Sequence, residues 1–246
     1  MHPRWITAFI DQPAELFDIG TLFWMSVTAS TMSPRRGERE EFATLLPSNG
    51  DAFVRVQIAA DAGAGVHIDF HVDSVPVAVA EARSLGAHVL DEGSHAVMSS
   101  PSGLRFCLVA SRGETDIPPS VGSPESALDQ ICLDIPADQF DDEVTFWRGL
   151  FGWDDRPVAR AEFHRLAEPV GLPFSLLFQR LGADSQATSA SAHLDIAAGE
   201  DREAIARQHE ALGATRIATF DRWIVMRDPL GLEYCVTGRS PGITQA

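Results

Sequence analysis

The chain has 246 residues, of which 45% are hydrophobic, and its formal net charge is −16 at pH 7. Such a length with so many apolar residues supports one large domain or two of modest size. The excess of acidic side chains argues against binding to nucleic acid or to an anionic membrane, since both surfaces would repel it. We therefore expect the partners to be small molecules or proteins, and the chain to be a monomer or a homodimer.

The location of the protein is predicted from its N-terminus and its cysteines. Residues 1–9 carry no signal-peptide pattern, and no stretch approaches the roughly 20 apolar residues that cross a bilayer. The three cysteines lie far apart within apolar, strand-like runs: Cys107, Cys132 and Cys235. Cysteines without paired spacing are typical of buried free thiols in a reducing compartment. We expect a cytoplasmic protein.

The first predicted elements are an opening strand and a helix within FIDQPAELFDIGTLFW, residues 9–24. A hairpin should follow, because PSNGD (47–51) separates the apolar runs 44–46 and 53–56, and Asn49 and Gly50 tolerate a positive φ. A strand is expected at 66–73, then a helix over about 75–85 that stops at Gly86. SPSGLRFC (100–107) reads as a turn and a closing strand.

The strand VHIDFHVD, residues 66–73, has two different faces. Side chains alternate across an extended chain, so one face carries four ionisable groups: His67, Asp69, His71 and Asp73. The other face is apolar and should pack on the helix of the same repeat: Ile68, Phe70 and Val72. We predict that the polar face points into a cavity rather than into bulk water.

The second half of the chain repeats the first. CLDIPADQFDDEVTFW (132–147) matches residues 9–24, AHLDI (192–196) matches VHIDF (66–70), and DPLGLEYC (228–235) matches residues 100–107. The nearly constant offset indicates a duplication. SRGETDIPPSVGSPES (111–126) is rich in Pro, Gly and Ser and suits a linker. We predict domains at 1–111 and 127–246, the latter with a short tail, and a linker at 112–126.

In the second copy the helix signals are clear. Apolar residues mark one helical face at Phe140, Val144, Trp147 and Phe151 before Gly152 supplies a stop. A second helix is expected over about 200–212, ending at Gly213. Each copy then contains two units of the order strand, helix, several strands, which predicts an α+β protein rather than one parallel sheet.

This pattern resembles the vicinal oxygen chelate superfamily, which includes glyoxalase I, bleomycin-resistance proteins and extradiol dioxygenases. The resemblance rests on the paired FW helices, GLFGW (149–153), the VHIDF and AHLDI strands, each followed by a Leu-Gly-Ala helix end, and DPLGLEYC. It implies tandem glyoxalase-like domains, each built of two βαβββ units that form a cup-shaped half-barrel with the site on its concave face.

In metal-using relatives, the resemblance implies, a divalent ion is held by opening-strand side chains and a closing-strand Glu. The matching positions are Thr7, His67 and Cys107 in the first copy, and Gln130, His193 and Cys235 in the second. Neither copy has the full ligand set, so we expect no metal and no other cofactor. Zinc on Gln130, His193 and Cys235, with Glu233 lending a carboxylate, is the alternative.

The predicted site is a concave polar face in each copy. In the first copy it consists of His67, Asp69, His71 and Arg105, and in the second of Gln130, His193, Asp195, Glu233 and Cys235, with Trp223 as a stacking residue. His193 and Glu233 are the candidate acid and base, because histidine titrates near neutrality. The alternative is that His67 and His193 only fill space or hydrogen-bond their neighbouring aspartates.

Three classes of function follow. A small-molecule-binding protein of the bleomycin-resistance type needs only a shaped pocket and is our first expectation. A metal-dependent lyase, isomerase or dioxygenase needs a filled coordination sphere. A metal-free enzyme that uses histidine and a carboxylate as acid and base lies between these two, and the substrate is not encoded in the fold.

Overall fold

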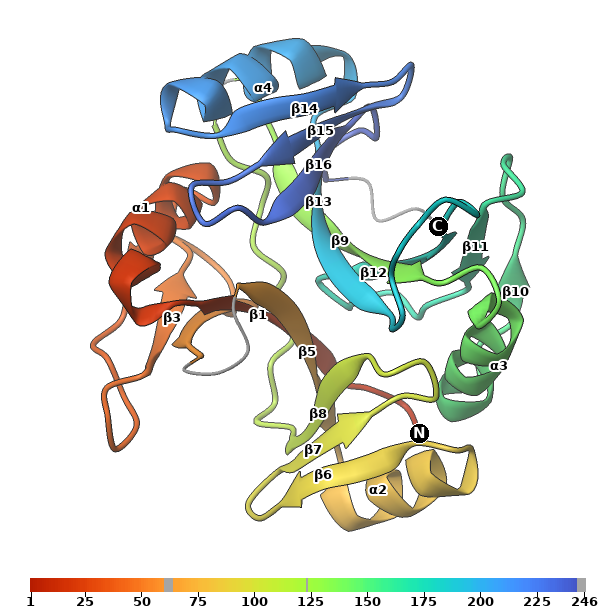
Figure 1. The fold of residues 1–246 in the computed structure, drawn as a ribbon. Coiled ribbons are helices and arrows are strands. Elements are labelled where there is room, and N and C mark those ends of the chain that lie inside the picture. Colours follow the sequence, from red (N-terminus) through yellow and green to blue (C-terminus); the bar gives the residue numbers. More distant parts are fainter. Residues whose placement is uncertain (60–63, 123, 243–246) are drawn as a thin grey trace. The chain divides into compact units, whose positions relative to one another are not determined.

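The computed structural model describes residues 1–59, 64–122 and 124–242. Residue 123 of the predicted linker and residues 243–246 of the predicted tail lie outside this range. In the described part, no helix combines the length and the apolar character that crossing a membrane requires. The protein has the predicted α+β architecture, in which each α-helix is followed by several strands (Figure 1).

The first copy contains eight strands, two α-helices and a short 3-10 helix among its described residues. In chain order these are β1 (Trp5–Gln12), η1 (Ala14–Leu16), α1 (Phe17–Val27), β2 (Thr31–Met32), β3 (Phe42–Leu46), β4 (Val54–Ile58), β5 (Gly65–Val72), α2 (Val75–Ser84), β6 (His88–Glu92), β7 (Ala96–Ser99) and β8 (Arg105–Ala110). The hairpin predicted around residues 47–51 is confirmed, because β3 and β4 pair antiparallel and Gly50 has a φ of 82°.

The second copy repeats this series. It consists of β9 (Ala127–Ile135), α3 (Phe140–Phe151), β10 (Asp155–Arg156), β11 (Phe163–Leu166), β12 (Ser175–Arg180), β13 (Ser191–Ala197), η2 (Gly199–Asp201), α4 (Arg202–Ala211), β14 (Thr215–Thr219), β15 (Trp223–Arg227) and β16 (Glu233–Thr237). Between β8 and β9, the described residues form only an isolated bridge, from Val121 to Ser126. The predicted helices at 75–85, 140–151 and 200–212 are confirmed within one or two residues.

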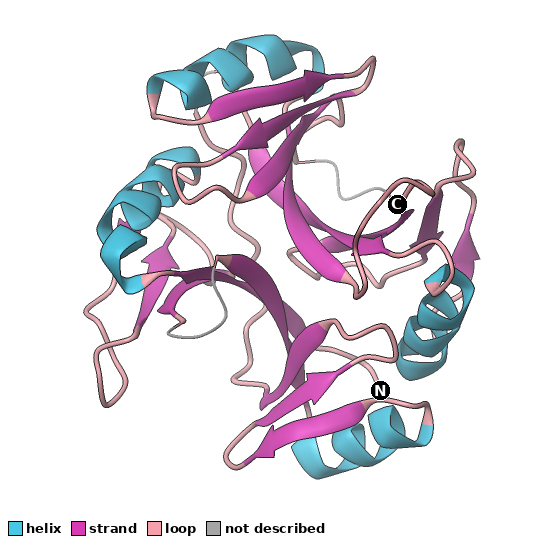
Figure 2. Cartoon of the chain, viewed as in Figure 1, coloured by secondary structure: helices cyan, strands magenta, loops and turns pink. Residues whose placement is uncertain are grey.

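The two copies have the same sheet topology. The strand order is β2-β3-β4-β1-β5-β8-β7-β6 in one sheet and β10-β11-β12-β9-β13-β16-β15-β14 in the other. Both are open and mixed: β5 with β8, and β13 with β16, pair parallel, whereas the outer strands form antiparallel hairpins. Helices α2 and α4 lie along the strands that follow them, as Figure 2 shows. The duplication read from the sequence is thus present in the fold.

The compact units of the structure are not the two copies. One unit contains residues 1–7, 67–115 and 131–192, and the other contains residues 8–66, 116–130 and 193–246. Each unit therefore joins half of one copy with half of the other. The two compact units therefore do not coincide with the two sequence repeats. The predicted limits 1–111, 112–126 and 127–246 describe the repeats, and they stay predictions.

Aromatic contacts hold the first compact unit together. The Phe70 ring of β5 lies 5.5 Å from Trp147 and 5.1 Å from Phe151, both on α3. We expected Phe70 to pack on the helix of its own repeat, and the structure shows that aromatic rings of the other copy also surround it. The buried residues of that helix, α2, are Ala78, Val79 and Ala82, which are too small to surround a phenyl ring. The aromatic face of α3 supplies the missing volume.

The second compact unit has the matching arrangement. Phe23 and Trp24 of α1 lie 5.9 and 5.4 Å from the Tyr234 ring of β16. The indole Nε1 of Trp24 donates a 2.9 Å hydrogen bond to Asp228, which also accepts from the backbone of Leu230 and Leu232. Burial raises the pKa of the Asp228 carboxyl, while the Trp24 indole and the backbone N–H groups act to lower it. A helix from the first copy thus covers strands of the second.

Helix α3 ends as its sequence predicts, and this end provides a test of the fold. Gly152 adopts a left-handed conformation with φ 67° and donates to the Arg148 carbonyl. A Cβ at this position would meet nothing nearer than 3.8 Å. Gly152→Ala should therefore destabilise the protein by about 1 kcal/mol through backbone strain alone. Denaturant unfolding measures this, and Gly152→Asn should cost less because Asn tolerates the same conformation. Equal stability of Gly152→Ala and the wild type would contradict the assigned cap.

Candidate functional site

The candidate site in the second copy is built on two neighbouring parallel strands. His193 and Asp195 alternate along β13 and so share one face, while Leu194 and Ile196 point to the buried opposite face. In the register between β13 and β16, Asp195 lies opposite Cys235. The strand pairing therefore places an imidazole, a carboxylate and a thiol side by side.

These three side chains form a compact cluster. The Nε2 atom of His193 lies 3.3 Å from Oδ1 of Asp195 and 3.6 Å from Sγ of Cys235. The side chain of Asp195 is 5% exposed and that of His193 is 15% exposed. Asp195 Oδ1 is completely shielded from solvent and makes no hydrogen bond with any described residue. We call His193, Asp195 and Cys235 the second-copy cluster.

The first copy has an equivalent cluster. In the parallel pairing of β5 with β8, Asp69 lies opposite Cys107, and His67 stands two residues before Asp69 on the same strand face. The Nε2 atom of His67 is 3.8 Å from Oδ1 of Asp69, and all three residues are buried. Both polar strand faces are thus largely removed from bulk water.

His71 takes part in a polar chain that the second copy does not have. Its Nε2 lies 2.9 Å from the Thr7 hydroxyl, and its Nδ1 lies 3.3 Å from a carboxylate oxygen of Glu114. Burial alone would raise the pKa of Glu114, but hydrogen bonds from the backbone N–H groups of Glu114 and Arg112, together with the nearby His71, lower it. The position matching His71 in the second copy is Ala197. The two sites are therefore related but not identical.

The other predicted site residues lie outside the two clusters or beside them. Glu233 is 52% exposed and forms a 2.8 Å ion pair with Arg227. Arg105 is exposed, Gln130 is buried on β9, and Trp223 stacks on Phe220 with ring centroids 4.8 Å apart. The structure therefore groups His193, Asp195 and Cys235, but does not bring Glu233 to them. The role predicted for Glu233 as an acid or base stays a prediction.

Three residues near these sites were not among the predicted site residues. Thr7 and Cys107 were named only as positions that match metal ligands of relatives, and Cys107 belongs to the first cluster. Glu114 carries no signal in the sequence, because its contact with His71 joins β5 to the segment after β8. Only the folded chain reveals Glu114.

Comparison with known proteins identifies the family. A model for a glyoxalase-like domain matches residues 8–109 and, a second time, residues 130–237. These two matches cover most of the chain. It belongs to the glyoxalase-like domain family. No curated protein matches its sequence at a significant level.

Solved structures share the fold of this glyoxalase-like protein. The Mn(II)-bound glyoxalase from Novosphingobium aromaticivorans is 16% identical, with a TM-score of 0.64 over 96% of this chain and 81% of that chain. The 2,2',3-trihydroxybiphenyl 1,2-dioxygenase from Sphingomonas wittichii is 9% identical, with a TM-score of 0.65 over 94% of this chain and 88% of that chain. A mutant 4-hydroxymandelate synthase from Streptomyces coelicolor is 14% identical, with a TM-score of 0.62 over 99% and 95%. At these identities the likeness concerns the fold.

The side chains of the glyoxalase-like protein can be tested against the divalent ion that its fold family implies. The closing-strand position expected to carry Glu is Cys235, but Asp195 supplies a carboxylate from the neighbouring strand. The ligand atoms of His193, Asp195 and Cys235 lie within 4.8 Å of one another. Imidazole, carboxylate and thiolate are all zinc ligands. The donor set therefore fits a divalent ion, although it differs from the set expected of the family.

Proposed function

We propose that this glyoxalase-like protein binds a small polar or aromatic molecule at the second-copy cluster. The observation that supports this proposal is that the carboxylate of Asp195, the thiol of Cys235 and the imidazole of His193 lie together. The His193 side chain is 15% exposed, so a ligand can reach it from solvent. Buried polar groups that remain reachable from solvent are typical of ligand sites. His67 is 10% exposed in the first copy, which makes the second copy the more accessible of the two.

The proposed ligand class is a hydroxylated aromatic compound. Two of the similar structures are named for 2,2',3-trihydroxybiphenyl and 4-hydroxymandelate. A phenolic hydroxyl can donate a hydrogen bond to the carboxylate of Asp195. It can also donate a hydrogen bond to a ring nitrogen of His193 or accept one from it. The chemistry of the cluster is thus compatible with this class.

An enzymatic role is the second candidate. His193 lies 3.3 Å from Asp195, a separation that allows the carboxylate to orient the ring for proton transfer. A lyase, isomerase or dioxygenase would consume its substrate, whereas a bleomycin-resistance-type protein would bind its compound and release it unchanged. Recovery of the compound after incubation with equimolar protein separates the two candidates.

Calorimetric titration of the full chain with catechol and with 4-hydroxymandelate tests the binding proposal. We expect at least one of the two to bind, and His193→Ala to weaken its binding at least about tenfold, the loss expected for one hydrogen bond in a buried site. His67→Ala is the matched control, because it removes the equivalent ring from the first copy and should leave the affinity unchanged. Binding of neither compound, or full affinity in both variants, would overturn the proposal.

A further inference from the structure

We propose that Asn49 is a site of self-modification, at which the chain converts this asparagine into an aspartyl or isoaspartyl residue without an enzyme. Asn49 is the only asparagine among the 246 residues, and a glycine follows it directly. It lies in the turn between β3 and β4, residues 47–53. The site belongs to neither polar cluster, so it is independent of the proposed function.

The reaction needs only water and groups that this turn contains. The backbone nitrogen of Gly50 loses its proton and forms a bond to Cγ of Asn49, while the bond from Cγ to the side-chain nitrogen breaks and ammonia leaves. Water then opens the resulting cyclic imide at either of its two carbonyl groups, and a new carboxylate appears. Because glycine has no Cβ, the nitrogen of Gly50 can approach the asparagine side chain with little steric hindrance.

The structure leaves both reacting groups accessible. Asn49 and Gly50 are exposed. Within the described part of the chain, neither the carboxamide of Asn49 nor the N–H group of Gly50 takes part in a hydrogen bond. Rotation of the peptide between these two residues toward the side chain therefore breaks no hydrogen bond. Hydroxide and water can reach both groups in the folded protein.

The turn is also longer than the tight turn that an asparagine–glycine pair usually forms. A two-residue hairpin turn of that kind holds both residues at positive φ. Here Gly50 has a φ of 82°, whereas Asn49 does not adopt a positive φ. The last residues that pair between the two strands are Leu45 and Val54. The strand ladder therefore does not fix the conformation of Asn49.

The residues next to the turn give the modification a structural consequence. The N–H of Asp51 donates a 2.6 Å hydrogen bond to the Asp116 carbonyl, and the N–H of Asp116 donates a 3.0 Å bond to the Asp51 carboxylate. A Cβ on Gly50 would lie only 2.7 Å from the Asp116 carbonyl oxygen and 2.8 Å from the nitrogen of Pro118. An isoaspartyl linkage would insert a methylene group into the main chain beside this close contact, and it would add a carboxylate to a turn that already carries Asp51. Modification should therefore weaken the contact of the turn with residues 116–118.

Incubation of the full chain at mildly alkaline pH, followed by isoelectric focusing and peptide mass spectrometry, tests the proposal. We expect an acidic species to accumulate, with the mass gain of an amide-to-acid exchange confined to the peptide that contains residue 49. Its rate of formation should rise with pH, because the Gly50 nitrogen must lose its proton. Asn49→Gln should lose this species, since a glutamine has to form a larger ring. Ser48→Ala is the matched control in the same exposed turn and should retain the wild-type rate.

Hydrogen exchange then measures the structural consequence. In the isoaspartyl form, separated by ion exchange, the backbone amides of Asp51 and Asp116 should exchange faster than in the unmodified chain. Unchanged exchange at both amides would overturn the weakened contact. A wild type that is folded by circular dichroism and forms no acidic species would overturn the modification site, and so would an acidic species that forms equally fast in Asn49→Gln.

Discussion

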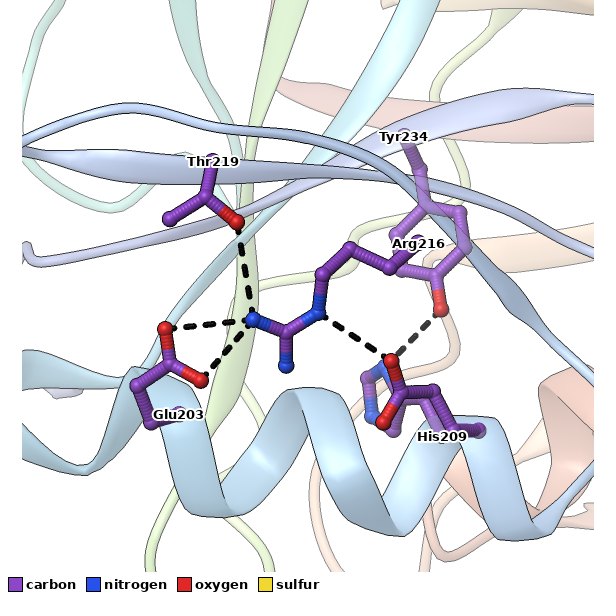
Figure 3. A network of polar contacts seen from close by, with 6 residues as sticks. Glu203, His209, Arg216, Thr219 and Tyr234 are labelled. Atoms are coloured by element: carbon purple, nitrogen blue, oxygen red, sulfur yellow. Dashed lines mark hydrogen bonds and ion pairs between the residues drawn. The ribbon is translucent and has the colours of Figure 1, made fainter.

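The free energy of unfolding should fall by about 3 kcal/mol as the pH is lowered from 7 to 4, owing to the single residue His209. This residue of α4 is buried, and its Nδ1 lies 3.0 Å from the Tyr234 hydroxyl. Figure 3 marks this contact with a dashed line. Burial raises the pKa of Tyr234, so the hydroxyl stays protonated and can form a neutral hydrogen bond with the imidazole. Burial also lowers the pKa of His209 from 6.5 to about 4.

The sign of this effect follows from the two pKa values. Between pH 6.5 and about 4 the unfolded chain protonates His209, whereas the folded chain keeps it neutral. The unfolded state therefore binds more protons, and stability decreases as the pH falls through this window. Other groups that face the ring are the phenyl ring of Phe23 and the hydroxyl of Tyr234. The former is uncharged and the latter stays protonated, so neither titrates in this range.

Urea unfolding at a series of pH values measures the effect. His209→Gln is the control, because glutamine is neutral and retains an acceptor for Tyr234. The stability difference between the wild type and this variant should shrink by about 3 kcal/mol between pH 7 and pH 4. Parallel curves for the two proteins would mean that His209 is protonated in the folded state. The ion pairs of Arg216 with Glu203 and Glu210, which also hold α4 to β14, are present in both proteins.

Replacing Glu143 with alanine should destabilise the protein by about 3 to 5 kcal/mol. Glu143 lies in the first turn of α3 and is completely buried. One carboxylate oxygen accepts a 2.8 Å hydrogen bond from Trp147 Nε1, and the other accepts a 2.9 Å bond from the backbone N–H of Ser102. Alanine would leave both donors buried without an acceptor, so the full cost of desolvating them would remain.

The same unfolding experiment with Asp142→Ala provides the control. Asp142 is the exposed neighbour in the same helical turn, so its removal tests the effect of losing one acidic side chain near the helix N-terminus. We expect a loss within about 0.5 kcal/mol for this variant. A Glu143→Ala protein as stable as Asp142→Ala would show that the carboxylate does not hold α3 against the segment containing Ser102.

The local elements of this protein were predictable because their signals are local. The helical period of Phe140, Val144, Trp147 and Phe151 and the glycine at 152 depend on residues within a few turns of one another. The alternation in VHIDFHVD likewise assigns His67 and Asp69 to one face before any partner strand is known. The constant offset between the copies then extended these assignments to the whole chain and pointed to the family that the comparisons confirm.

The tertiary structure decided how the halves combine and which side chains meet. Phe70 lies against Trp147 and Phe151 of the other copy, and the buried residues of α2 are too small to surround its ring by themselves. Likewise, the strand register places Cys235 opposite Asp195, whereas Glu233 lies outside the paired residues of these two strands and forms an ion pair with Arg227. The sequence by itself determined the repeat, the elements and the face of each strand that carries the polar groups. The site depends on how side chains pack and on the register between strands that are distant in the sequence. Local sequence patterns do not encode either of these, so only the tertiary structure determined the site.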